Sequence, residues 1–512
     1  MRKLPLSVFA WVALWFCTPL SGIDQIDEAI DLKKQSFIPV FVRMSDQVIG
    51  RAGEYEKLCR ELSGKPRSQN RKEVLAQLRG KADKSWEKIG KTAEVLVEKG
   101  EIRALRRFWI VNGFSCLAKP SAIRKFAKRT DVSYVYLDRF ARPPKKPMPM
   151  ADKQMTAMKE ALATWKKKEP EPILSLRIPW NVRGIGAELA WKEENATGRG
   201  VTVAVIDSGI LPTPSLIRAL VKNPKEELNG KDDDGNGLID DVFGYDFINS
   251  TAYVLETGTT TSHGSACAGI IAGRSSAKGW QTAIAPDCRL LPLKGGFNLH
   301  SMEYLLLNGA DLVSMSYMIV GRDLGQIRGL FRNAFEHMSL GGVLAVGGAG
   351  NYGPKSRRAM PAGKQIGLPK DIPSVLAVAG VDQKRVALPF SSQGPCFWDG
   401  VEFFSDYPKD KPLGKPDLTA FPTGYPVWNI TGSHRLRPDW KEVSKDKGAS
   451  LVVGPAGNSF SGPHCAGVAA LVFSANPAIN PWEVSEILQE TAKDLGPKGR
   501  DHVYGAGLID AL

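Results

Sequence analysis

Residues 201–207 read VTVAVID, and this short stretch decides the fold class. Six residues, five of them β-branched, stand between Gly200 and Asp207, which is typical of a strand buried on both faces. Because strands without polar alternation occur in parallel sheets covered by helices on both sides, the stretch predicts an α/β fold.

Similar apolar runs recur further along the chain, at residues 290–293, 312–315, 343–346 and 375–378. Segments with helical spacing lie between them, for example 265–272 and 301–309. Short buried strands alternating with helices predict a parallel β-sheet flanked by helices, in a domain over residues 179–512. Functional side chains then belong at the carboxyl ends of strands and at the adjacent helix starts.

Residues 36–140 have a different texture and predict a separate small α+β unit. The expected order is strand, helix, strand, helix, strand, at residues 37–42, 71–99, 105–117, 120–127 and 132–137. Between this unit and the larger domain, residues 141–178 are interpreted as a linker and processing region. They contain RPPKKPMPM (142–150), a short exposed helix over 155–168, and EPEPIL (169–174).

The N-terminus is typical of a secretory signal peptide over residues 1–22. Arg2 and Lys3 precede an uncharged, mostly apolar run from Leu4 to Leu20, and the small residues Ser21 and Gly22 follow. A short membrane anchor is the alternative.

The composition, with 43% hydrophobic and 24% charged residues among 512, excludes a disordered or collagen-like chain. Residues 1–178 hold 36 Lys and Arg against 20 Asp and Glu, a net charge of +16, whereas residues 179–512 carry −2. The basic excess is therefore confined to the first third, and nothing indicates a nucleic-acid partner.

Six cysteines follow the N-terminal segment without CxxC spacing. They predict free buried thiols, with disulfides as the alternative if the protein is exported: Cys59, Cys116, Cys267, Cys288, Cys396 and Cys465.

Three polar residues stand where functional groups are expected. Asp207 ends the strand, His263 precedes the small-residue helix SACAGIIAG, and Ser459 lies in the glycine-rich turn of GNSFSGPHCAGVAALV. A serine hydroxyl becomes a good nucleophile only with a base to take its proton and a carboxylate to orient that base. Each residue alone is more typical of a turn or a helix cap, but together they form such a set.

The order Asp–His–Ser is that of subtilisin, and the chain resembles the subtilisin-like serine proteases, or subtilases, from about Ile178 to Leu512. The resemblance rests on the segments VTVAVIDSGI, HGSACAGIIAG, GADLVSMSY, GVLAVGGAGN, KPDLTAFPTG and GNSFSGPHCAGVAAL. It implies a catalytic triad of Asp207, His263 and Ser459, with Asn351 as the side-chain donor to the oxyanion. The implied substrate-binding positions are Ser314, Ser316, Gly348 and Gly350.

The resemblance also identifies residues 36–140 as similar to the inhibitory, ferredoxin-like pro-domain of the family, which implies a self-processing zymogen cut between Asp138 and Pro179. The chain departs from the family at Ser265 and Asn458, where Thr is usual, and at Tyr317 to Ile319, which leaves the shape of the specificity pocket open. Cys267, one helical turn after His263, is similar to the cysteine of a thiol-sensitive, proteinase K-like subgroup.

Residues 229–241, NGKDDDGNGLIDD, are acidic and rich in glycine. Four of them fall on ligand positions of a calcium loop, although the bidentate Glu is missing because Phe243 stands at its position: Asp232, Asp234, Asn236 and Asp240. The prediction is a structural calcium site, and the alternative is a solvated acidic turn.

The sequence thus predicts a monomeric serine endopeptidase that is exported, either secreted or held in the cell envelope, and that needs no cofactor for its chemistry. Its expected partners are protein or peptide substrates and its own pro-domain. One rival is a binding protein on an inactive subtilase fold, which should lack a triad residue or the Asn. A second is an esterase, against which the triad order argues.

Overall fold

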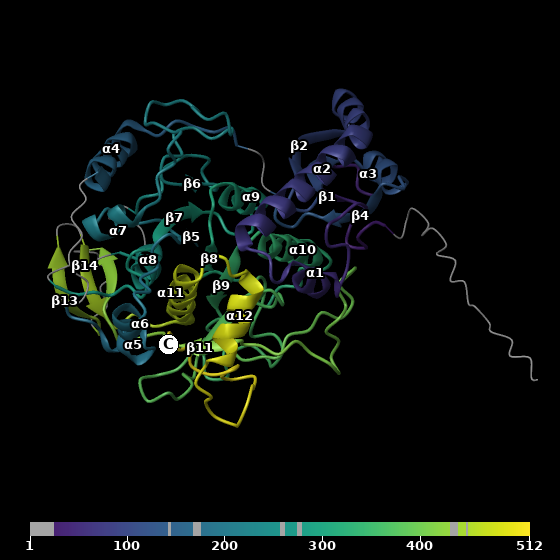
Figure 1. Ribbon diagram of the computed structural model, residues 1–512. Coiled ribbons are helices and arrows are strands. Elements are labelled where there is room, and N and C mark those ends of the chain that lie inside the picture. The colour runs from purple at the N-terminus through teal and green to yellow at the C-terminus, as the bar shows by residue number, and fades with distance from the viewer. Residues whose placement is uncertain are drawn as a thin grey trace, which may run out of the picture.

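The structure is a computed structural model that describes residues 25–141, 145–166, 176–256, 262–273, 279–430, 439–446 and 449–512 of the 512-residue chain. The predicted signal peptide and parts of the predicted processing region lie outside these residues. Two units pack against each other: an N-terminal α+β unit that ends near residue 141, and a larger α/β unit built on the central sheet (Figure 1). No helix in the described ranges is long and apolar enough to cross a membrane.

The central sheet has seven parallel strands in the order β11-β10-β9-β8-β5-β7-β6. All five strands predicted from apolar runs are present, and β6 and β11 are added at the edges. The predicted fold class is therefore confirmed. The strands are β5 (Thr202–Ile206), β6 (Tyr245–Asp246), β7 (Arg289–Lys294), β8 (Leu312–Met315), β9 (Leu344–Gly348), β10 (Val375–Gly380) and β11 (Leu418–Ala420).

Helices cover both faces of this sheet, which explains why its strands are apolar throughout. In β5, Val203 and Val205 enter the core under α8 (His263–Ile271) and α11 (Asn458–Ala475). Ala204 and Ile206 enter the opposite core with α9 (Leu299–Leu307) and α10 (Ile327–Leu340). The remaining helices of this unit are α5 (Trp180–Gly184), α6 (Ala187–Glu193), α7 (Pro214–Ala219) and α12 (Pro481–Glu490).

A small antiparallel sheet beside α8 was not predicted. It consists of β12 (Val427–Ile430), β14 (Ala449–Val453) and β13 (Lys441–Asp446), in that order. Trp428 of β12 packs closely on Gly269 of α8, where an added Cβ would come within 2.2 Å of the indole. The glycine in the small-residue helix is therefore needed for this close approach.

The N-terminal unit is an antiparallel four-stranded sheet, ordered β2-β3-β1-β4, with helices packed on it. The predicted single strand over 105–117 is wrong: the chain turns at residues 109–112 to form a hairpin. The elements are β1 (Ile38–Met44), α1 (Glu54–Leu62), α2 (Arg67–Glu98), β2 (Ile102–Phe108), β3 (Gly113–Ala118), α3 (Pro120–Ala127) and β4 (Val132–Leu137).

The N-terminal unit lies on α9 and α10 of the α/β unit (Figure 1), and the contact is buried and polar as well as apolar. Glu303 of α9 accepts hydrogen bonds from the N–H groups of Trp109 (2.6 Å) and Ile110 (3.1 Å). Nε2 of the fully buried His337 accepts from Ile49 N–H at 2.9 Å, and its Nδ1 donates to the Ile110 carbonyl at 2.5 Å. The hairpin turn that interrupts 105–117 is apolar because it forms part of this contact.

The connection between the units contains α4 (Asp152–Lys166), close to the helix predicted over 155–168. The sequence predicted an exposed helix, but Met158 and Ala161 are buried against the α/β unit. Trp165 donates from its indole nitrogen to the Leu220 carbonyl at 2.8 Å, which ties the helix to the end of α7.

Candidate active site

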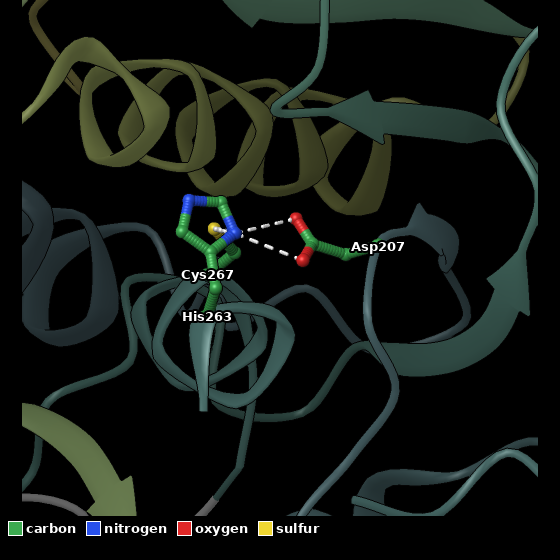
Figure 2. Close-up of side chains that lie close together, drawn as sticks. All are labelled: Asp207, His263 and Cys267. Carbon is green, nitrogen blue, oxygen red and sulfur yellow. Dashed lines mark hydrogen bonds and ion pairs between the residues drawn. The ribbon is translucent and has the colours of Figure 1, made fainter. Parts of the chain in front are cut away.

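Asp207 and His263 meet at the carboxyl end of β5. Asp207 is the first residue after that strand, and His263 is the first residue of α8. Nδ1 of His263 donates to both carboxylate oxygens of Asp207, at 2.8 and 2.9 Å (Figure 2). This contact orients the ring so that its other nitrogen, Nε2, faces away from Asp207.

The Asp207 side chain is only 9% exposed, and its oxygens are held by other donors as well. The Ser208 N–H donates to Oδ1 at 2.8 Å, and the Ser208 hydroxyl lies 3.1 Å from the same oxygen. Burial would raise the pKa of Asp207, but the neighbouring imidazole and these hydrogen bonds outweigh it and lower that pKa. Asp207 is therefore a carboxylate at neutral pH.

His263 is half-buried, with 32% of its side chain exposed. Burial alone would lower its pKa, but the Asp207 carboxylate and its hydrogen bond to Nδ1 favour the imidazolium and raise the pKa. Asp207 thus stabilises the protonated ring, which is the form that a general base reaches when it has taken a proton.

Ser459 lies on the facing helix, as the second residue of α11. Its carbonyl accepts from the Ser316 hydroxyl at 2.7 Å and lies 3.4 Å from Sγ of Cys267. The next residue, Phe460, places its ring 5.8 Å from the imidazole of His263, measured between centroids. The three residues predicted as a triad therefore come from β5, α8 and α11 to one end of the sheet.

Asn351 follows β9 at the same end of the sheet, after Ala349 and Gly350. Its side-chain oxygen accepts from the backbone N–H of Asn458 at 2.8 Å. Because only the amide oxygen can accept, this contact fixes the orientation of the amide and leaves the NH2 group as its donor. Asn351 is thus a hydrogen-bond donor beside the start of α11.

The start of α11 rests directly on the backbone of β9 and β10. A Cβ on Gly348 would come within 1.9 Å of the Asn458 carbonyl oxygen, and one on Gly380 within 2.2 Å of Asn458 Oδ1. The Asn458 side chain donates to the Gly350 carbonyl (2.8 Å) and to Ser391 (2.9 Å). Asn458, which stands where the family usually has Thr, thus takes part in holding this floor.

The four predicted substrate-binding residues lie at different depths. Ser316 and Gly350 stand beside the site, and Gly348 forms the floor just described. Ser314 is only 1% exposed inside β8, so its side chain lies below any surface that a substrate would touch. Two residues after Ser316, Met318 fills the space between two segments: a Cβ on Gly350 would come within 2.2 Å of its methyl carbon, and Gly367 N–H donates to its sulfur at 3.3 Å.

The acidic loop does not assemble the four predicted ligands. Asp232 instead accepts from the backbone N–H groups of Gly235, Asn236 and Gly237, and Oδ1 of Asp240 accepts from those of Asn229 and Gly230. These contacts are typical of turns.

A different carboxylate set forms beside the loop. Oxygens of Glu226, Asp234 and Asp241 lie within 4.8 Å of one another. Burial and the neighbouring carboxylates raise the pKa of Glu226 to about 7, and burial above all raises that of Asp241 to about 6. Of the predicted ligands, only Asp234 belongs to this group. Glu226 stands outside the acidic run, and Asp241 lies beyond the ninth position of the proposed loop, so the loop pattern misses both.

All six cysteines of the described chain are free and buried, as predicted: Cys59, Cys116, Cys267, Cys288, Cys396 and Cys465.

The sequence profile of the family described as "Subtilase family" matches residues 198–507. The chain is 28% identical over 358 residues to Serine protease AprX of Bacillus subtilis, covering 63% of this chain and 68% of that protein. It is 24% identical over 430 residues to Subtilisin E of the same organism, with 82% and 84% coverage. The match to Minor extracellular protease Epr, at 27% identity over 340 residues, spans 64% of this chain but only 40% of Epr.

Proposed function

The chain belongs to the subtilase family, and from this premise we propose that it is an exported serine endopeptidase made as a self-processing zymogen. The observation that carries the proposal is the Asp207–His263 hydrogen bond at 2.8 Å, facing the helix start that bears Ser459. Asn351 beside that helix start supplies the further donor that acyl transfer needs.

In the proposed reaction, Oγ of Ser459 attacks the carbonyl carbon of a peptide bond while Nε2 of His263 takes the hydroxyl proton. The carbonyl oxygen becomes negatively charged and is held by the Asn351 NH2 group and the Ser459 N–H. His263 then gives its proton to the amine as the C–N bond breaks. Water repeats these steps on the acyl-serine ester and regenerates Ser459.

Asp207 has two roles in this scheme. Its contact with Nδ1 keeps the hydrogen on that nitrogen, so that Nε2 carries the lone pair that takes the proton. Its negative charge stabilises the imidazolium that forms in the transition state.

The N-terminal unit, over the predicted residues 36–140, is proposed as the inhibitory pro-domain. Its close packing on α9 and α10, with Glu303 and His337 bonded to its backbone, supports a folding unit that stays bound until the connection is cut. The signal-like N-terminus and the relative whose name describes an extracellular protease support export.

We further propose that Glu226, Asp234 and Asp241 hold a structural calcium ion, replacing the set predicted from the loop. Glu226 is fully buried, yet no residue of the described chain bonds its Oε2, and one of its carboxylate oxygens belongs to the converging group. Asp234 and Asp241 also line a cavity of about 930 Å³, through which an ion and its waters could enter. Carboxylate oxygens are the ligands that Ca²⁺ prefers.

The test of the main proposal compares Ser459→Ala with Ser485→Ala, a serine of α12 away from the site. Ser459→Ala should lose hydrolysis of a peptide amide by many orders of magnitude and keep the N-terminal unit attached. Ser485→Ala should mature and turn over normally. Amide hydrolysis retained in Ser459→Ala would refute the mechanism, and maturation of that variant in a protease-free system would refute self-processing.

A further inference from the structure

Glu256 is a buried carboxyl group behind the proposed triad, seven residues before His263, and only 2% exposed. Its backbone N–H donates to the Ile210 carbonyl at 2.8 Å, which holds it against the turn after β5. Each of its two oxygens contacts one serine hydroxyl, Oε1 that of Ser208 and Oε2 that of Ser265. These serines follow Asp207 by one residue and His263 by two.

The Ser208 hydroxyl has more neighbours than it has protons. Its oxygen accepts from Gly264 N–H at 2.9 Å, lies 3.1 Å from Oδ1 of Asp207, and is bonded to Oε1 of Glu256. A hydroxyl donates one hydrogen bond and accepts two. It can therefore donate to Asp207 or to Glu256, but not to both at once.

The Ser265 hydroxyl proton has only one direction in which to point. Its oxygen accepts from Leu211 N–H at 2.7 Å, so its single proton is directed at Oε2 of Glu256. If Glu256 is a neutral acid protonated on Oε1, it donates to Ser208, and Ser208 donates to Asp207. Every polar hydrogen in the group then has an acceptor. If Glu256 is ionised, the Ser208 hydroxyl can donate to only one of the two carboxylates, Asp207 or Glu256. The other carboxylate then has one hydrogen-bond donor fewer.

We propose that Glu256 is a positioning residue that sets the basicity of His263 through Ser208 and Asp207. This inference rests on the proposed function, in which Asp207 and His263 act as a pair. When neutral, Glu256 turns the Ser208 hydroxyl toward Asp207 and stabilises that carboxylate. When Glu256 loses its proton, Asp207 loses the hydroxyl and gains a negative neighbour, and the imidazole holds its proton more tightly.

The charged groups around Glu256 allow both states near neutral pH. Burial raises the pKa of Glu256 to about 7, and the Asp207 carboxylate contributes in the same direction. Lys294, whose ammonium donates to the adjacent Leu255 carbonyl at 3.3 Å, opposes this by favouring the ionised acid. Asp246, 4.0 Å from the Lys294 nitrogen, partly compensates that positive charge, and His263 lies beyond Asp207.

The test uses Glu256→Gln, which has the shape of the neutral acid and donates to Ser208 at every pH. The pKa of His263, followed by NMR and assigned with His263→Gln, should fall by about 0.5–1 unit, a size reasonable for one nearby charge. The ascending limb of kcat/KM against pH should move by the same amount. Ser208→Ala with Glu256 intact should move both in the opposite direction.

The double variant Glu256→Gln with Ser208→Ala shows whether Ser208 carries the effect. Relative to Ser208→Ala, the shift caused by Glu256→Gln should be at most half of that in the parent. An undiminished shift, or an unchanged His263 titration in folded Glu256→Gln, would overturn the proposal. Because the NMR titration needs no turnover, a chain without peptidase activity would refute the proposed function and still test Glu256.

Discussion

Sγ of Cys267 lies 3.9 Å from Nδ1 of His263, one helical turn along α8 (Figure 2). The same sulfur is 3.4 Å from the Ser459 carbonyl oxygen, so it touches two of the proposed catalytic residues. Burial raises the pKa of Cys267 despite the nearby imidazole, and the group is a neutral thiol at neutral pH. It is placed to disturb the site when modified, although the proposed reaction does not use it.

We therefore expect a small mercurial to inhibit the enzyme, because a metal on Sγ would displace the His263 ring. Inhibition should be faster at higher pH, where more of the thiol is ionised. Cys267→Val should stay active and become resistant, whereas Cys465→Ala, in α11, should remain sensitive. Inhibition that persists in Cys267→Val would place the reactive thiol elsewhere.

Asn351→Ala should fold and bind substrate but turn over slowly, because the transition state loses one donor. We expect kcat to fall by about 10²–10³, the range measured for one such donor in subtilisin itself. KM should change little, and single-turnover kinetics would separate the two. Near-normal kcat would mean that Asn351 only supports Asn458.

Removing calcium should lower the melting temperature of the full chain. An ion that binds only the folded state stabilises it by about 2.7 kcal/mol when present at 100 times its Kd. Glu226→Gln should abolish the difference between calcium and chelator, while Asp232→Asn, in the same region but outside the cluster, should keep it. Equal melting curves with and without chelator would return the loop to a solvated turn.

Acid should weaken the packing of the N-terminal unit through His337. Burial lowers the pKa of His337 to about 3, and both its nitrogens are bonded to the N-terminal backbone in the neutral form. An unfolded or undocked His337 has a pKa near 6.5. The neutral ring therefore makes its full contribution to the free energy of unfolding above about pH 6.5. Below it, stability falls by up to about 1.4 kcal/mol per pH unit until the folded pKa is reached.

Urea unfolding of full-length Ser459→Ala protein between pH 7 and 4 measures this effect. His337→Gln should have a shallower dependence on pH than its parent. The buried His464, whose pKa burial lowers to about 4, is present in both and cancels in the comparison. Identical slopes would show that His337 does not carry the acid sensitivity.

The strands of the central sheet were predictable because each is a short, uninterrupted apolar run. Few structures other than a buried parallel strand produce that sequence pattern. The residues after β5 and at the starts of α8 and α11 could be identified for the same reason: the topology brings those positions together. In the N-terminal unit the pattern failed at 109–112, where residues are apolar because they contact a second unit rather than continue a strand. Local periodicity contains no information about such a partner.

The acidic loop and Glu256 illustrate a second limit. Spacing within a loop predicted Asp232 and Asp240, but backbone N–H groups nearby satisfy those carboxylates, and Glu226 joins from outside the acidic run. Glu256 has no motif at all, since its role follows from two serines that only the folded chain places around it.

The seating of α11 on glycine backbone has a consequence for how this chain can evolve. At Gly348 the main chain of β9 meets the main chain of Asn458 and Ser459, and no side chain lies between them to yield or repack. Substitutions in the two cores can therefore accumulate while Ser459 keeps its place, whereas a single methyl group at Gly348 would displace it. A survey of random variants should find this glycine, which takes no part in the chemistry, as intolerant as the triad, and new specificities should arise by changes around Met318 instead.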